Sequence, residues 1–100
     1  MNFEQLEKKV AEWGKDRGLL SMDNGRNQLI KTFEELGELA RAELHQDLDE
    51  QIDAIGDIIV TLILYCRING LDITDCLESA YNVIKDRKGK LINGSFVKDI

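Results

Sequence analysis

Two short acidic segments with the same layout constrain how this chain folds. Glu34 and Glu38 lie four residues apart, as do Asp53 and Asp57, and a glycine directly precedes the second acid of each pair. Because an α-helix turns by about 100° per residue, residues four apart share one face. Fourteen residues separate Glu38 from Asp53, enough to end one helix, turn, and begin another beside it. The sequence therefore predicts a helical hairpin with carboxylates on both arms.

The length and composition indicate one small helical domain. The chain has 100 residues, no proline and 6% aromatic residues, and it is rich in residues that favour helices over sheets. A chain of this length forms one domain, residues 1–100, with a modest core. We expect an all-α fold with an antiparallel four-helix core and a short irregular or hairpin tail, assembled as an oligomer.

Apolar residues recur at helical spacing in four stretches, and turn formers separate them. A first helix is predicted over about residues 3–17, capped by Asn2 and stopped by Gly18. The other three are predicted over about 26–45, over 49–69, and from a cap at Asp72 or Thr74 to Gly89. Asn93-Gly94, with apolar pairs on both sides, then predicts a small hairpin or a hooked tail.

The third predicted helix is apolar on nearly every side between Ile58 and Cys66. A helix of that kind must be covered all round, and a small chain has few elements with which to cover it. We therefore predict a homo-oligomer, either a dimer or a tetramer. A β-strand over Ile58–Leu64 is the alternative that periodicity leaves open. The run is too short to span a bilayer and no signal peptide is visible, so we expect a cytoplasmic protein without a membrane partner.

Charge is segregated along the chain, whose net charge of -6 argues against binding nucleic acid. Between Thr32 and Val60 there are nine acids and one base, whereas Lys85 to Lys98 holds five bases and one acid. An acidic middle that binds a metal and a basic tail that binds phosphate would suit a metal-dependent enzyme acting on phosphate anhydrides. The alternative is that both are solvated faces.

The candidate metal ligands on the two predicted helices are all carboxylates: Glu34, Glu35, Glu38, Asp53 and Asp57. Oxygen ligands favour Mg²⁺ over iron or zinc, and Mn²⁺ is possible. A di-iron site of the Glu-x-x-His kind is excluded, because Ala42 precedes the single histidine by three residues.

Two other features of the sequence bear on its interpretation. Gly37 and Gly56 lie inside predicted helices, where each costs about 1 kcal/mol relative to alanine. We expect them to permit close approach of the two helices. Cys66 and Cys76 show no zinc or disulfide spacing and are interpreted as small apolar residues.

The acidic pattern resembles that of a known family. Glu34-Glu35-Leu36-Gly37-Glu38, followed by Gly56-Asp57 and a tail containing Tyr81-Asn82 and Arg87-Lys88-Gly89-Lys90, is similar to the MazG-like members of the all-α NTP pyrophosphohydrolases. The family pattern has a glutamate three residues before the last aspartate, and Ala54 stands there in this chain. Asp53 is expected to take over that ligand's role.

The resemblance implies an Mg²⁺-dependent enzyme that hydrolyses a nucleoside triphosphate to the monophosphate and pyrophosphate. It implies metal binding by four carboxylates, Glu35, Glu38, Asp53 and Asp57, and activation of water by Glu34 or Glu35. Phosphate or sugar contacts would come from five residues: Lys31, Asn82, Lys85, Arg87 and Lys88. The alternatives are a surface ion pair for Lys31 and favourable charges at a helix end for the others. Trp13 either stacks on a base or belongs to the core.

Two other functions are compatible with this sequence. One is a phosphoribosyl-ATP pyrophosphatase of the same superfamily. The other is a catalytically weak MazG-like module that senses nucleotides or binds proteins, in which Ala54 would reflect weakened chemistry.

Overall fold

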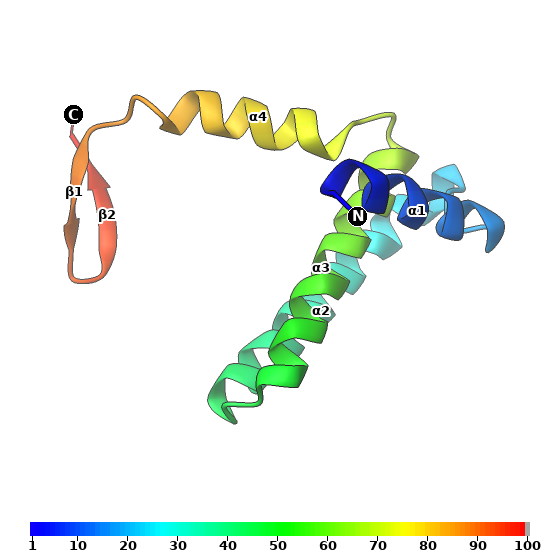
Figure 1. Cartoon of the computed structure of the whole chain (residues 1–100), viewed down its shortest axis with the longest axis horizontal. Coiled ribbons are helices and arrows are strands. Elements are labelled where there is room, and N and C mark those ends of the chain that lie inside the picture. Colours follow the sequence, from blue (N-terminus) through cyan, green and yellow to red (C-terminus); the bar gives the residue numbers. More distant parts are fainter. Residues whose placement is uncertain (100) are drawn as a thin grey trace.

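The computed structural model describes residues 1–99, and it is mainly helical (Figure 1). Its elements are α1 (Phe3–Asp16), a short 3-10 helix η1 (Met22–Asn24), α2 (Gly25–Leu44), α3 (Leu48–Ile68), α4 (Ile73–Ile84), β1 (Gly89–Ile92) and β2 (Ser95–Lys98). The first three helices confirm the prediction within a few residues. The segment from 58 to 64 is helical, so the alternative of a β-strand there is wrong.

Polar caps set the helix boundaries. The Gln5 amide donates to Asn2 Oδ1 at 2.9 Å, and the Asn2 amide donates to Gln5 Oε1 at 3.0 Å, which forms a capping box at the start of α1. Asp72 Oδ1 accepts from the amides of Thr74 and Asp75 at the start of α4. These contacts satisfy amide groups that have no partner within the helix, and they confirm Asn2 and Asp72 as caps.

The antiparallel helices α2 and α3 form the long hairpin of the fold (Figure 1). Their shared face buries Ala42, Ala54 and Leu64 together with polar residues. The hydroxyls of Thr32 and Thr61 are 2.8 Å apart and join the two helices. Side chains three, four and seven residues apart meet along such an interface, so the predicted helical hairpin is confirmed.

Helix α1 crosses the end of this hairpin and is held there by a close contact and an ion pair. A Cβ atom on Gly14 would lie 2.5 Å from Leu64 Cδ2, so any larger residue would require the Leu64 side chain or α1 to shift. Glu7, which is buried, accepts from Arg67 Nε and Nη2 at 2.7 and 2.6 Å. Two parallel charge-assisted hydrogen bonds fix the orientation of α1 on α3.

Gly37 and Gly56 do not lie at the contact between α2 and α3, where the sequence predicted them. No atom lies within 4 Å of a Cβ built on either residue. The prediction that they permit close approach of α2 and α3 is therefore wrong for a single chain. Both glycines are exposed, because the face that joins the two helices is the neighbouring one, which carries Ala42, Ala54 and Thr61.

Helix α4 and the β-hairpin extend away from the other helices, and we call residues 73–98 the arm (Figure 1). No residue of α4 is buried, and α4 contacts α3 only where the two helices join. The core of one chain therefore consists of α1, α2 and α3, and the expected four-helix core is not formed within it. Among residues 1–99, no single helix is long and apolar enough to cross a membrane; α3 and α4 qualify only as a pair bent by 103°.

The C-terminal hairpin was predicted from its turn. Asn93 and Gly94 have φ values of 50° and 80°, the positive values that a two-residue hairpin turn requires. Gly89 pairs with Lys98 at the open end of the hairpin. Helix α4 ends at Ile84, and Gly89 is the first residue of β1. The prediction that α4 continues to Gly89 is therefore wrong. Ile100, the last residue of the predicted tail, lies outside the described residues.

Candidate active site

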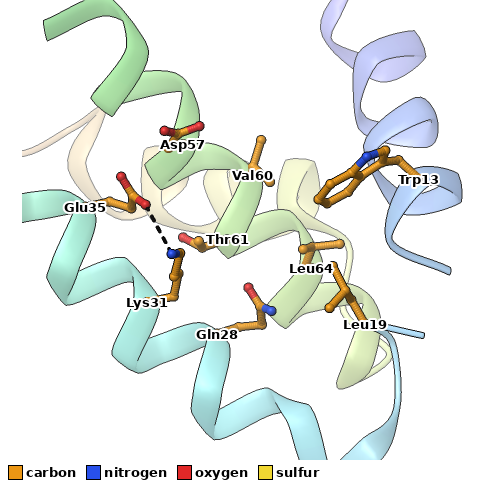
Figure 2. Close-up of a pocket in the computed structure, with 9 residues that line it drawn as sticks. All are labelled: Trp13, Leu19, Gln28, Lys31, Glu35, Asp57, Val60, Thr61 and Leu64. Atoms are coloured by element: carbon orange, nitrogen blue, oxygen red, sulfur yellow. Dashed lines mark ion pairs between the residues drawn. The ribbon is translucent and has the colours of Figure 1, made fainter. Parts of the chain in front are cut away.

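A cavity of about 470 Å³ lies where α1, α2 and α3 meet (Figure 2). Helix α1 and the segment after it contribute Trp13 and Leu19. The side chains from α2 and α3 are Gln28, Lys31, Glu35, Asp57, Val60, Thr61 and Leu64. The α2 and α3 residues recur at spacings of three and four, so each helix turns one stripe toward the cavity. One end of the cavity is charged and the other is largely apolar.

Glu35 is the most buried charged group of this cavity, with 6% of its surface exposed. Its Oε2 atom is enclosed and has no hydrogen-bond partner. Lys31 Nζ lies 3.9 Å from the other oxygen, Oε1, and 3.8 Å from Glu34 Oε2 (Figure 2). Since buried polar atoms are nearly always paired, the free oxygen of Glu35 is a position where a ligand would be stabilising.

The surroundings of Glu35 raise the pKa of its carboxyl above the ordinary value. Burial is the largest cause, followed by the neighbouring Glu38 carboxyl and then by the charge of Asp57. Lys31 acts in the opposite direction but does not compensate. Three carboxylates that disfavour one another's charge are expected where a cation or a proton is taken up during function.

The apolar end of the cavity combines aromatic and aliphatic walls with one amide. The Trp13 ring lies across from Gln28 and next to Leu64 (Figure 2). Arg17 lies over the Trp13 ring, 4.7 Å from its centroid, in a cation–π contact. Trp13 is 43% exposed, so it lines the cavity and is not sealed in the core.

The structure separates the acidic residues that the sequence grouped together. Glu35 and Asp57 line the main cavity, and Glu38 lines an adjacent cavity of about 370 Å³ together with Glu50. Asp53 is exposed and lines none of the described cavities, whereas Ala54 beside it is 3% exposed and faces the core.

Glu34 is also outside the main cavity. Its side chain is 61% exposed and pairs only with Lys31. Of the two residues expected to activate water, Glu35 is therefore the one that the cavity encloses.

The predicted phosphate-binding residues of the arm lie apart from the cavity. Asn82 is exposed on α4, and Lys85, Arg87 and Lys88 are exposed just after it. None of them lines the cavity. Within one chain, Lys31 alone among the predicted phosphate contacts lies beside the carboxylates.

A metal cage is not assembled within one chain. Over residues 1–99, no group of three or more histidine, cysteine, aspartate or glutamate side chains lies close enough together to hold a metal ion. The carboxylates near the cavity are close enough to raise the pKa of Glu35, but they do not converge on a single position where an ion could bind.

Sequence reasoning missed several residues that line the cavity. Val60, Thr61 and Leu64 follow Asp57 at three, four and seven positions, which places all four on one helix face. That spacing was a usable signal. Leu19 follows α1 in a segment without periodicity, so only the folded chain shows its place.

Mainly helical proteins with a carboxylate-lined cavity on a helical hairpin include the all-α nucleotide pyrophosphohydrolases, and comparison with known families agrees. The model of the phosphoribosyl-ATP pyrophosphohydrolase family matches residues 5–82. The chain belongs to this family, and the resemblance to MazG-like nucleotide pyrophosphohydrolases is confirmed. The family is named for a pyrophosphohydrolase activity.

Among curated proteins, the chain is similar to an uncharacterized 18.2 kDa protein in the rep-hol intergenic region of Haemophilus phage HP1 (strain HP1c1). The two are 32% identical over 71 residues, which cover 71% of this chain and 44% of the phage protein. The chain thus spans less than half the length of that relative. No solved structure gives a significant match.

Proposed function

We propose that the protein is an Mg²⁺-dependent nucleoside triphosphate pyrophosphohydrolase, which cleaves an NTP or dNTP to the monophosphate and pyrophosphate. The observation that carries the proposal is the buried Glu35 carboxylate, whose Oε2 has no partner at the charged end of the cavity. Family membership supports the reaction class. The shape of the cavity supports a substrate with a flat apolar part and a polyanionic part.

The donor set suits Mg²⁺ in particular. Mg²⁺ keeps several waters and is usually bound through one or two carboxylates and substrate phosphates, so it needs no cage of protein ligands. Glu35 and Asp57, which line the main cavity, would hold it, with the free oxygen of Glu35 as one ligand, and Glu38 is retained as a candidate third ligand. Asp53 is retained as a candidate fourth ligand. When bound, the ion supplies neutralisation of phosphate charge and acidification of water.

The chain's own residues have separable tasks in this reaction. Lys31 Nζ, beside Glu35, would bind a phosphate oxygen and orient the triphosphate. Glu35 would accept a proton from the attacking water, whose oxygen bonds to phosphorus as the bridge between the α- and β-phosphates breaks.

We also propose that the active protein is a homo-oligomer. Leu77, Tyr81 and Val83 on α4 are 70%, 57% and 63% exposed, and exposed apolar patches of this kind mark interfaces. The partner is a second copy of the chain, because the basic end of the arm complements the acidic α2–α3 hairpin. That contact would bring bases such as Arg87 to carboxylates of another chain.

The test is release of pyrophosphate from canonical and modified (d)NTPs, with Mg²⁺ and with excess chelator. We expect Mg²⁺-dependent release that falls at least 100-fold in Glu38→Gln and Asp57→Asn, with Glu12→Gln on the exposed face of α1 as the matched control. Release from no nucleotide would leave a nucleotide-sensing or protein-binding module. Full activity in both site variants would contradict the assigned site.

A second candidate is phosphoribosyl-ATP pyrophosphohydrolase, which the printed name of the matching family favours. This substrate also presents an adenine base and a triphosphate, so the same cavity suits it. Including phosphoribosyl-ATP in the panel separates the two readings. A kcat/KM for it at least tenfold above that for ATP would favour the second candidate.

A further inference from the structure

Gln28 is a buried amide whose polar end has no protein partner. The residue is 8% exposed, and its backbone carbonyl accepts from Thr32 Oγ1 at 2.8 Å. Over the part of the chain that the structure describes, its side-chain amide makes no hydrogen bond, yet its atoms are not among the enclosed unpaired ones. The amide is therefore open to the cavity that it lines (Figure 2).

Two polar groups without protein partners thus lie on the same face of α2. Glu35 Oε2 is at the charged end and the Gln28 amide is seven residues earlier, about 10 Å along the helix. Lys31 lies between them. This sequence of amide, ammonium and carboxylate along one stripe matches a ligand that is polar along its length and flat at one end.

The walls around Gln28 indicate what the flat end is. Trp13 offers a partly exposed ring across the cavity, and Leu19 and Leu64 complete an apolar surround. A planar ring can stack there while its polar edge meets one donor and one acceptor of the amide. Every nucleobase carries a donor next to an acceptor on its edge, which a glutamine amide can pair in a bidentate manner.

We propose that Gln28 reads the base of the nucleotide substrate, with Trp13 as the stacking surface. This proposal rests on the proposed function, whose phosphate end lies at Lys31 and Glu35. Gln28 is then the residue that pairs with the polar edge of the base.

Binding of uncleavable ligands tests this without relying on turnover. Wild type, Gln28→Met, Gln28→Glu and the matched control Gln51→Met would be titrated with α,β-methylene analogues of ATP, GTP, CTP and UTP, and with inorganic tripolyphosphate. Calorimetry gives the Kd values, and quenching of the single tryptophan reports stacking on Trp13. Gln51 pairs with Glu43 away from the cavity, so its substitution changes an amide without changing the site.

We expect Gln28→Met to weaken every base-bearing analogue about tenfold, with no change for tripolyphosphate, which has no base. Gln28→Glu should shift the ranking toward the guanine analogue, because guanine presents two adjacent N–H donors to a carboxylate. Circular dichroism checks that both variants fold, and one folded variant is sufficient.

Three outcomes would overturn the role of Gln28. One is equal weakening of tripolyphosphate, another is unchanged Kd values and ranking in the folded variants, and the third is no binding of any analogue by wild type. Failure of the proposed function is a separate result, namely analogue binding that depends on Gln28 without pyrophosphate release from any nucleotide.

Discussion

The α1–α3 unit and the arm both contain helices with an apolar face, but that face is buried in the α1–α3 unit and exposed in the arm. Leu64 of α3 is 2% exposed, whereas Leu77 of α4 is 70% exposed. Both helices carry apolar residues at helical spacing and both begin with an aspartate cap. The difference teaches that an apolar stripe predicts that a face will be covered, but not by which chain.

Polar burial separates the two regions as well. The α1–α3 unit buries Glu7, Gln28, Glu35 and Thr61, and α4 buries no residue. Glu7 and Thr61 are paired within the chain, while Glu35 and Gln28 face a cavity with unused hydrogen-bonding capacity. A buried polar group without a hydrogen-bond partner is destabilising unless a ligand supplies the partner. The two unpaired groups therefore indicate a binding site in the α1–α3 unit.

The largest effect is expected in the core. Leu64→Ala should lower the free energy of unfolding by about 2–5 kcal/mol, because it removes a fully buried side chain that also supports the crossing of α1. Urea unfolding at fixed chain concentration measures the loss. Leu48→Ala, at a position 65% exposed, is the control and should cost less than about 1 kcal/mol. Equal losses of unfolding free energy in the two variants would contradict the assignment of Leu64 to the core and Leu48 to the surface.

A smaller effect in the arm tests whether another chain covers it. Leu77→Ala should destabilise by about 2 kcal/mol at concentrations where chains assemble, and by almost nothing after dilution to monomer. Thermal unfolding over a range of concentrations, with sedimentation of the same samples, measures both quantities. Ser79→Ala on the same helix is the control. A wild-type monomer of 11.4 kDa at all micromolar concentrations would leave the arm uncovered and contradict the oligomer.

The smallest effect has the opposite sign. Glu35→Gln should stabilise the metal-free protein by about 1 kcal/mol at pH 8, since it removes a charge that burial disfavours. The pKa of Glu35 is raised from an ordinary value of 4.5, so folding favours its protonated form. The cost of its charge is absent below pH 4.5 and appears as the pH rises through the folded-state pKa.

The gain from Glu35→Gln should therefore vanish at pH 4. Thermal unfolding at pH 4 and pH 8 in chelator measures it, and about 1 kcal/mol corresponds to a Tm shift of about 4–8 °C. Glu34→Gln, at an exposed neighbour, is the control. A variant less stable than wild type at pH 8 would show that the Glu35 charge is favourable in the fold.

Much of the local structure was predictable from sequence because its causes are local. Asn2 and Asp72 cap helices through contacts two or three residues away, and Asn93-Gly94 makes its turn through its own backbone angles. The helical hairpin followed from periodicity in the same way. Glu35 and Asp57 were placed in one region because their helices are consecutive and antiparallel.

What sequence reasoning missed depends on tertiary contacts. The apolar end of the cavity exists because α1 crosses α3, and the residues that Gly14 and Glu7 meet at the crossing, Leu64 and Arg67, are distant in the sequence. Asp53 and Ala54 differ by one helical position, and the crossing geometry, not the spacing of acids, turns Ala54 toward the core. The open space beside Gly37 and Gly56 likewise reflects which faces the two helices share.

The contact of Gly14 with Leu64 has a consequence for how such proteins diverge. An alanine Cβ at position 14 would lie 2.5 Å from Leu64 Cδ2, so either the Leu64 side chain or α1, which carries the neighbouring Trp13, would have to shift. Glycine and alanine codons differ by one nucleotide. A single point mutation at this position can therefore change how closely α1 and α3 pack beside the cavity, whose lining includes Trp13 and Leu64.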